Sequence, residues 1–207
     1  MSEVYILFTK LPKAGYVKTR LSPAYSAVDA AAIQAKLLQM IAARASKLPH
    51  AITLWCCYEA FGDEGLVSRW KKRLPARFQW VPQIAGSLGQ RMNAAFEEAQ
   101  ASGFQKIILS GSDLVGLTPE YLHRAFAALN KKTAVIAPTL DGGYGLIGFA
   151  GPIDTGTIFL SDISWSTASV FQTTLMLLQK MAASTQILPQ LIDIDLPKDV
   201  LQLQREP

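Results

Sequence analysis

Basic side chains crowd the segment after the first apolar run of the chain, where they could bind an anion. The cations of this segment are Lys10, Lys13, Lys18 and Arg20. No acidic residue occurs between residues 4 and 28, and Gly15 leaves the chain free to wrap around a ligand. Cations and backbone N–H groups together suit a di- or triphosphate, although a solvated basic loop would have the same composition. Neither the Walker A motif nor the dinucleotide-binding glycine motif occurs.

Carboxylates follow two later apolar runs and could hold a divalent cation. Asp113 comes just after residues 106–110, and a carboxylate at the end of a strand beside a basic loop can bind a metal that neutralises phosphate charge. Asp193 and Asp195 alternate, so they point to one face of a strand, and one of them could share an ion with Asp113 if the two segments are neighbours. An aspartate in such a position also caps helices or ties turns.

Two further segments combine polar groups with an aromatic ring. Asp141, Gly142, Gly143 and Tyr144 form a turn that offers a carboxylate, two flexible residues and a ring able to stack on a sugar or base. Trp165, Ser166 and Thr167 lie where we expect a helix over residues 166–181 to start, so backbone N–H groups and hydroxyls there could bind an anion. An ordinary glycine turn and a capped helix beside a core tryptophan are the structural alternatives.

Apolar runs alternating with helical patterns must position these residues. We expect strands over residues 4–8, 52–58, 78–81, 106–110, 134–138, 145–149 and 191–194. We expect helices from Asp29, as cap, to about Lys47, and over residues 64–73, 88–102, 119–129 and 166–181, with a terminal helix opened by Pro197. Strands that are apolar throughout and separated by helices indicate an α/β, doubly wound, mainly parallel sheet with helices on both faces. Ligands of such sheets bind beyond the carboxyl ends of the strands.

Composition narrows the class of protein. The chain has 207 residues, of which 50% are hydrophobic and 17% charged, so it has the size of a single domain over residues 1–207 and is not intrinsically disordered. The charge of +4 is scattered, which favours a small phosphorylated ligand and no nucleic acid. No apolar run is long enough for a membrane span, and we expect no export signal. Cys56 and Cys57 are adjacent and are expected to be reduced core thiols, so we expect a cytoplasmic protein.

Six motifs in a fixed order resemble a bacterial family of glycosyltransferase-like proteins. These motifs are Lys10-Leu-Pro-Lys-Ala-Gly-Tyr-Val-Lys18-Thr-Arg20-Leu21, Leu88-Gly89-Gln-Arg91-Met92, Gly111-Ser112-Asp113, Asp141-Gly-Gly-Tyr144-Gly-Leu-Ile-Gly148, Ile163-Ser-Trp165-Ser-Thr167 and Asp193-Ile-Asp195-Leu-Pro-Lys-Asp199. The family belongs to the nucleotide-diphospho-sugar transferase superfamily, and some members are assigned to arsenosugar biosynthesis. The resemblance covers nearly the whole chain and implies the Rossmann-like GT-A type fold.

The resemblance also implies roles for individual residues. Nucleotide-binding residues would be Lys10, Lys18, Arg20, Gln83, Leu88 and Gly89, with the two cations of the Lys-Thr-Arg stretch on the phosphates. Asp113 and Asp195 would bind Mg²⁺ or Mn²⁺, and Asp113 and Asp141 would be the catalytic residues. The sugar or acceptor side would be lined by Gly142, Gly143, Tyr144, Trp165, Ser166 and Thr167.

Two positions depart from the pattern of the family, and three functions follow as alternatives. Leu114-Val115-Gly116 follows Asp113 where the family has Asp-x-Pro, and Gly145 follows Tyr144 where the family has a second tyrosine. The leading hypothesis is a metal-dependent transferase that passes a sugar from a nucleotide-sugar to a small acceptor. The alternatives are a nucleotidyltransferase that joins an NTP to a small phosphorylated acceptor with release of pyrophosphate, and a nucleotide-binding protein with a degenerate site. The oligomeric state has no signature in the sequence.

Overall fold

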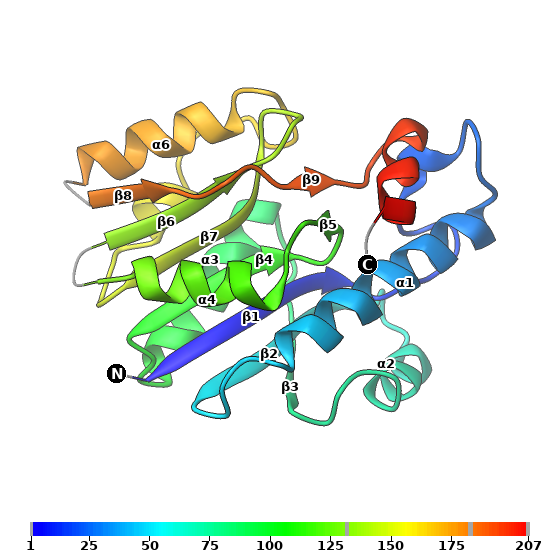
Figure 1. The fold of residues 1–207 in the computed structure, drawn as a ribbon, viewed down its shortest axis with the longest axis horizontal. Helices are drawn as coiled ribbons and strands as arrows, with labels where there is room; N and C mark the ends of the chain where they lie inside the picture. Colours follow the sequence, from blue (N-terminus) through cyan, green and yellow to red (C-terminus); the bar gives the residue numbers. More distant parts are fainter. Residues whose placement is uncertain (1, 131–132, 182–183, 206–207) are drawn as a thin grey trace.

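A seven-stranded sheet organises the chain, of which the computed structural model describes residues 2–130, 133–181 and 184–205. The order across the sheet is β3-β2-β1-β4-β7-β6-β8, and only β7 runs antiparallel to its neighbours (Figure 1). The strands are β1 (Glu3–Lys10), β2 (Ile52–Glu59), β3 (Phe78–Pro82), β4 (Lys106–Gly111), β6 (Thr133–Pro138), β7 (Tyr144–Ala150) and β8 (Ser184–Ile187). The predicted α/β fold with a mainly parallel sheet is therefore confirmed.

Helices cover both faces of this sheet. They are α1 (Ala27–Ala45), α2 (Glu64–Lys71), α3 (Leu88–Ala101), α4 (Pro119–Ala128), α5 (Gly156–Phe159) and α6 (Val170–Lys180). Apolar side chains of α1, α2 and α4 pack on one face, and those of α3, α5 and α6 pack on the other. In Figure 1, α1 and α4 lie in front of the sheet and α3 lies behind it. None of the helices in these ranges is long and apolar enough to cross a membrane.

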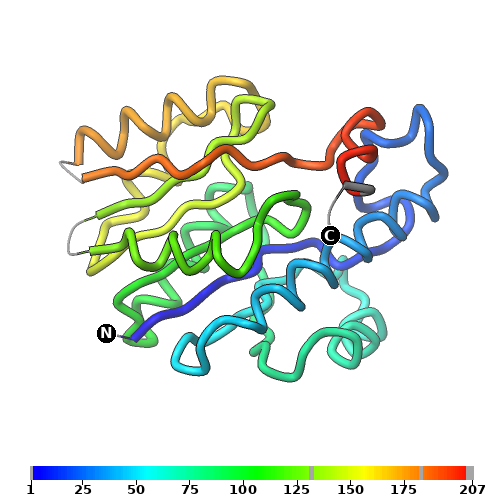
Figure 2. Tube along the Cα trace, in the orientation of Figure 1, coloured from blue at the N-terminus to red at the C-terminus, as the bar shows by residue number. Residues whose placement is uncertain are grey.

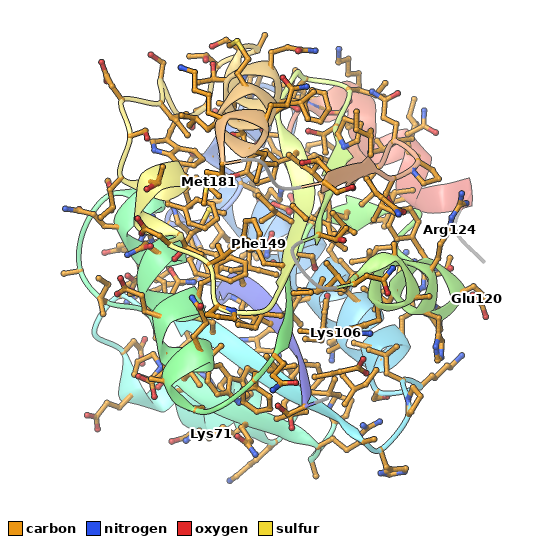
Figure 3. All side chains as sticks on the ribbon, turned by 90° about the vertical axis from the view of Figure 1, so that its left-hand side faces the viewer. Lys71, Lys106, Glu120, Arg124, Phe149 and Met181 are labelled. Carbon is orange, nitrogen blue, oxygen red and sulfur yellow. The ribbon has the colours of Figure 1, made fainter. Side chains whose placement is uncertain are left out.

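β1 shows why an unbroken apolar run becomes a central strand. Tyr5 and Leu7 pack with the α1 face, Val4 and Ile6 pack with the α3 face, and all four are fully buried. Successive side chains of a strand point to opposite faces, so a strand covered on both sides needs apolar residues at every position. Figure 3 views the molecule from one end of the sheet. The apolar Phe149 lies in the packed interior there, whereas the charged Lys71, Glu120 and Arg124 extend outward from helices.

The antiparallel strand and a second, small sheet bring distant segments to one edge. β1 and β4 both end at this edge, with Phe8 opposite Gly111. Because β7 is antiparallel to β4, its first residues lie there as well, and so does the turn between β6 and β7. β5 (Leu114–Val115) pairs with β9 (Ile192–Asp193), which carries the end of the chain across the same edge.

The C-terminal segment packs against the first helix. η2 (Pro197–Arg205) is a 3₁₀ helix that Figure 2 shows in red beside the blue N-terminal segments. Its Leu203 shares an apolar cluster with Leu37 of α1, Val115 of β5 and Ile194. Such contacts between the two ends of the chain hold β9 over the edge of the sheet at which β1 and β4 end.

Several predicted boundaries were wrong. Helix α1 starts at Ala27, because the Ser26 hydroxyl accepts a hydrogen bond from the N–H of Asp29 and so takes the capping position expected for Asp29. α6 starts at Val170 and not at Ser166, whose φ of 65° is left-handed. The predicted strand over residues 191–194 is shortened to β9 and lies outside the main sheet. β5, α5 and β8 were not predicted.

Candidate active site

A cavity of about 430 Å³ opens beyond the carboxyl ends of β1 and β4. All predicted site residues line it except Gly89 and Gly142, and so do Asp193 and Arg91. Its walls come from the basic loop after β1, the start of α3, the end of β4, the β6–β7 turn, the loop before α6, and β9. This is the edge at which ligands of open α/β sheets bind, and the volume suits a small organic ligand.

The centre of the cavity holds a lysine among carboxylates. Lys18 Nζ lies 2.7 Å from Asp113 Oδ2 and 3.6 Å from Asp193 Oδ1, and only 5% of the Lys18 side chain is exposed. The guanidinium of Arg20, two residues further on, donates a hydrogen bond to Asp195 Oδ2, but its side chain is 62% exposed. The cations predicted to bind phosphate are therefore paired with the carboxylates predicted to bind metal.

Burial and charge shift the proton affinities of this cluster. Burial by itself lowers the pKa of Lys18, but the charges of Asp113 and Asp193 outweigh it and raise that pKa above its ordinary value. Burial and the nearby Asp113 charge raise the pKa of the Asp193 carboxyl, even though Lys18 opposes the rise. Asp193 Oδ1 is buried and accepts no hydrogen bond among the described residues. Lys18 therefore stays cationic, whereas the Asp193 carboxyl binds a proton more readily than a free aspartate does.

A buried chain of hydroxyls supports the segment that carries Asp113. The Gln34 side-chain amide of α1 donates to Ser112 Oγ at 2.8 Å, and Ser112 Oγ lies 2.7 Å from Thr9 Oγ1 at the end of β1. The N–H of Ile194 donates to the carbonyl oxygen of Asp113, next to the β5–β9 pair. These contacts hold Asp113 between β1 and β9. Thr9 and Gln34 were not predicted, and the Gly-Ser-Asp motif that contains Ser112 carries no sign of such partners.

The side chain of Gln83 is occupied by the protein itself. Its Nε2 donates to the carbonyl oxygens of Thr9 and Cys57, and its Oε1 accepts from Arg91 at 3.1 Å. Gln83 therefore positions the guanidinium of Arg91, which lines the cavity and whose Nε is buried without a hydrogen-bond partner among the described residues. Arg91 lies in the predicted Leu88–Met92 motif, but nothing in its spacing distinguished it from a surface arginine.

Gly89, which the resemblance assigned to nucleotide binding, lies where two helices pack closely. A Cβ on Gly89 would lie 2.1 Å from the carbonyl oxygen of Phe159 and 3.0 Å from Trp165 Nε1. The glycine therefore lets α3 approach α5 and lets the Trp165 indole lie against the helix. Leu88, the first residue of α3, reaches the cavity itself.

The acidic turn between β6 and β7 is built to fix one carboxylate. Asp141 Oδ1 accepts hydrogen bonds from Thr139 Oγ1 at 2.6 Å and from the Gly143 N–H at 3.1 Å. Gly142 has φ 86°, and a Cβ there would lie 2.3 Å from the carbonyl oxygen of Ala168. The glycine thus allows the loop before α6 to pack directly on the turn. Asp141 is also close enough for its charge to raise the pKa of Asp193.

The aromatic and hydroxyl residues of the far wall are arranged differently from the prediction. The Tyr144 hydroxyl is buried beside that of Thr174, and neither has a hydrogen-bond partner of good geometry among the described residues. Trp165, Ser166 and Thr167 form a turn before α6 and not its first residues, with Thr167 Oγ1 donating to the carbonyl oxygen of Ser164. They still line the cavity, but they belong to the loop before α6, so they do not supply the N–H groups of the first helical turn.

The two departures from the pattern of the family face one another. A Cβ on Gly145 would lie 2.4 Å from Leu114 Cδ2, and Leu114 is almost fully buried. The leucine after Asp113 therefore occupies the space that a larger residue after Tyr144 would need. The two departures are therefore compatible with one another in this chain.

The fold and the site together define a class. A mainly parallel sheet with one antiparallel strand and a polar cavity at its carboxyl edge is the nucleotide-diphospho-sugar transferase fold, and the chain has that fold over almost its whole length. A crystal structure of a "putative nucleotide-diphospho-sugar transferase" from Desulfovibrio desulfuricans G20 superimposes with a TM-score of 0.88 at 32% identity, covering 99% of this chain and 87% of that one.

The chain belongs to the family described as "Uncharacterized protein conserved in bacteria (DUF2064)", whose model matches residues 29–167. The resemblance inferred from the motifs is thereby confirmed. No curated protein matches the chain in sequence.

More distant structures share the fold alone. A 4-diphosphocytidyl-2C-methyl-D-erythritol synthase from Anaerococcus prevotii has a TM-score of 0.60 at 11% identity, with 96% of this chain and 93% of that chain covered. The mannosyltransferase PcManGT from Pyrobaculum calidifontis, solved with GDP-mannose and Mn²⁺, has a TM-score of 0.56 at 12% identity, with 93% and 56% covered. One fold therefore hosts both nucleotidyl and glycosyl transfer, so the choice between them depends on the site.

The carboxylates of the cavity fit a divalent cation. Asp113 and Asp193 approach the same Lys18 ammonium, and Asp193 Oδ1 is a buried oxygen without a hydrogen-bond donor. Within the ranges that the structure describes, no three acidic, histidine or cysteine side chains converge on one point. Mg²⁺ is commonly held by one or two carboxylates that are completed by substrate phosphates and water, which is the arrangement these residues allow.

Proposed function

We propose that this protein is a metal-dependent transferase that takes a nucleotide-diphospho-sugar as donor and passes the sugar to a small acceptor. The observation that carries the proposal is the cluster of the buried Lys18 with the half-buried Asp113 and Asp193 inside a cavity at the carboxyl ends of β1 and β4. The fold and the related protein of Desulfovibrio desulfuricans support the same class.

The donor would lie along the wall formed by the basic loop and α3. Lys18 and Arg20 would bind the diphosphate, whose charge needs several cations when it leaves. Lys10, Leu88 and the Arg91 guanidinium that Gln83 holds would surround the nucleoside. Gln83 itself would act by positioning Arg91, because all of its side-chain groups already have protein partners.

Asp113 together with Asp193 or Asp195 would hold Mg²⁺ or Mn²⁺. When bound, such an ion neutralises the diphosphate and makes it a better leaving group. The chain would contribute the carboxylates and their orientation, which the Thr9, Gln34 and Ser112 side chains and the β5–β9 pair maintain.

The acceptor would lie against the β6–β7 turn and the loop with Trp165. Asp141 would accept the proton of an acceptor hydroxyl as its oxygen bonds to the anomeric carbon and the bond from that carbon to the diphosphate breaks. Both hydrogen bonds to Asp141 come to Oδ1, so the carboxylate keeps one orientation. Gly143, Tyr144 and Trp165 would shape the space for the sugar.

Product analysis tests the proposal. The protein would be incubated with Mn²⁺ and a panel of UDP-, GDP-, ADP- and CDP-sugars, with water and small hydroxy compounds as acceptors, and nucleoside diphosphate would be measured. We expect release from at least one donor, with loss of about 100-fold or more in Asp113→Asn and in Asp141→Asn. Lys71→Met is the matched control, because Lys71 is exposed on α2 and does not line the cavity.

Two results would replace this function. Pyrophosphate release from an NTP in the presence of phosphorylated acceptors, without diphosphate release from any nucleotide-sugar, would show nucleotidyl transfer. Tight nucleotide binding without product from either panel would show a binding protein that uses the same cavity.

A further inference from the structure

Two cations of the basic loop, Lys18 and Arg20, each have an acidic partner inside the site. Lys18 contacts Asp113 and Asp193, and Arg20 contacts Asp195. The Lys18 side chain is 5% exposed, whereas that of Arg20 is 62% exposed. The charge of Lys18 is thus already neutralised by contacts with two carboxylates, while Arg20 is exposed to solvent.

Either ligand by itself would face a penalty at Lys18. A divalent ion that approached Asp113 and Asp193 would meet an ammonium group already bound there. A diphosphate that drew Lys18 away would leave two neighbouring, half-buried carboxylates without a counter-charge, which is costly. Both penalties vanish when the two ligands bind together, because each charge then has an opposite partner.

The backbone around Lys18 is held while its side chain can change partner. Val17 and Leu21 on either side are buried, and Lys18 itself has a left-handed φ of 49° at the start of η1 (Thr19–Leu21). A residue in this conformation persists when its surroundings fix it, so the loop is anchored at the point where the lysine projects. Rotation of the long side chain, without movement of the loop, moves the ammonium from the carboxylates into the cavity that it lines.

We propose that Lys18 exchanges partners. In the ligand-free protein it occupies the place of the divalent ion between Asp113 and Asp193, and it passes to the diphosphate when the ion takes those carboxylates. Metal and diphosphate binding are therefore coupled through Lys18, so that neither ligand binds well without the other. The inference rests on the proposed function, because it takes a diphosphate and a divalent ion as the ligands of this cavity.

Binding measurements without any sugar donor test the exchange. Mn²⁺ is titrated into the protein by calorimetry and by electron paramagnetic resonance, alone and with inorganic pyrophosphate, with free concentrations corrected for the complex that the two form in solution. In the wild type we expect weak Mn²⁺ binding alone and a gain of at least about 100-fold with pyrophosphate, at the upper end of usual couplings between sites. In Lys18→Met we expect Mn²⁺ alone to bind at least about tenfold more tightly and the gain with pyrophosphate to fall at least about tenfold.

The direction in which Lys18→Met changes the affinity for Mn²⁺ alone distinguishes the exchange of partners from other roles of Lys18. A lysine that only binds phosphate would leave Mn²⁺ affinity unchanged when it is replaced, and a lysine that only supports the fold would lower it. Either result would overturn the proposal. Lys71→Met, outside the cavity, should match the wild type in every titration.

A second variant covers the case in which Lys18→Met does not fold. Lys18→Gln combined with Asp193→Asn removes one charge of each sign and keeps the site balanced. Its Mn²⁺ affinity should exceed that of Asp193→Asn alone, and equal affinities would overturn the exchange. If no variant binds Mn²⁺ below millimolar concentration, the exchange fails together with the metal site. The product assay for transfer decides the proposed function independently, since it measures nucleoside diphosphate and not metal binding.

Discussion

Arg20 and Lys18 differ by two positions in the chain, yet the structure places them in different environments. Arg20 lies at the mouth of the cavity, where 62% of its side chain is exposed, and pairs with Asp195. An exposed guanidinium can turn to an incoming phosphate without leaving a buried charge behind. Arg20 is therefore suited to be the first contact of the diphosphate.

Replacement of Arg20 should weaken phosphate binding. Charge-assisted hydrogen bonds contribute about 1.5–3 kcal/mol each, so Arg20→Ala should raise the Kd for pyrophosphate with Mn²⁺ about ten- to a hundredfold. Arg20→Lys should recover only part of the loss, because an ammonium cannot make a planar two-pronged contact. Calorimetry measures the effect. Unchanged affinity in Arg20→Ala would mean that the loop binds no phosphate through this residue.

The adjacent thiols Cys56 and Cys57 should be inert in the folded protein. Both are buried in β2, and burial raises the pKa of Cys57 to about 12 and that of Cys56 further. Since the thiolate is the reactive form, only a very small fraction of these side chains is reactive at pH 8. We expect no rapid reaction with a disulfide reagent at pH 8, and two reactive thiols after unfolding in guanidinium chloride. Fast modification of the native protein would show that β2 opens.

At the scale of elements, the distance between a helix and its neighbours decides whether a glycine in that helix stabilises or destabilises the fold. Gly89 in α3 faces the Phe159 carbonyl oxygen, while Gly65 in α2 has only ordinary contacts for an added Cβ, at 3.4 Å or more. Helix propensity alone favours alanine over glycine at both positions by up to about 1 kcal/mol. At Gly89, tertiary packing reverses this preference, because an alanine there would collide with the Phe159 carbonyl oxygen.

Two alanine substitutions should therefore act in opposite directions. Gly89→Ala should lower the free energy of unfolding by about 2 kcal/mol or more, because backbone must move to admit the new atom. Gly65→Ala should raise it by about 0.5–1 kcal/mol. Urea denaturation followed by circular dichroism gives both values. If Gly89→Ala is at least as stable as the wild type, α3 does not pack on α5 as described.

Arg77 joins the end of α1 to the start of β2 without touching the cavity. Its guanidinium donates to the carbonyl oxygens of Ser46, Leu48, Pro49 and Ile52. Arg77→Met should lower the free energy of unfolding by about 2–3 kcal/mol, since several carbonyls lose a charged donor. Mn²⁺ and pyrophosphate affinities should stay within about twofold of the wild type, and a larger change would mean that this turn is coupled to the site.

At the scale of the whole molecule, one sheet connects almost every element. The seven strands are continuous from β3 to β8, and helices on each face contact several of them. We therefore expect a single domain that unfolds in one step. Differential scanning calorimetry should show one transition with equal calorimetric and van't Hoff enthalpies. Two separable transitions would show that the α6–β8 edge folds by itself.

The local sequence pattern was sufficient to predict the helices and strands that are buried or clearly amphipathic. β1, β2 and β4 each contain a run of apolar residues, and Thr118 with Pro119 marks the start of α4. β8 escaped prediction because it is a short edge strand, Ser184–Ile187, of mostly polar and exposed residues. An edge strand is held by backbone hydrogen bonds to one neighbour, and these leave little trace in side-chain type.

The sequence by itself determined which residues could do chemistry: a cationic loop, Asp113, the acidic turn at Asp141 and the alternating Asp193 and Asp195. Only the tertiary structure decided how they pair. Lys18 and Asp113 are 95 positions apart, and Arg20 and Asp195 are 175 apart. Spacing along the chain specifies the face of one strand or helix, whereas contacts between distant segments depend on strand order and packing. That is why Lys18 lies inside the acidic cluster while Arg20 remains exposed at the mouth of the cavity.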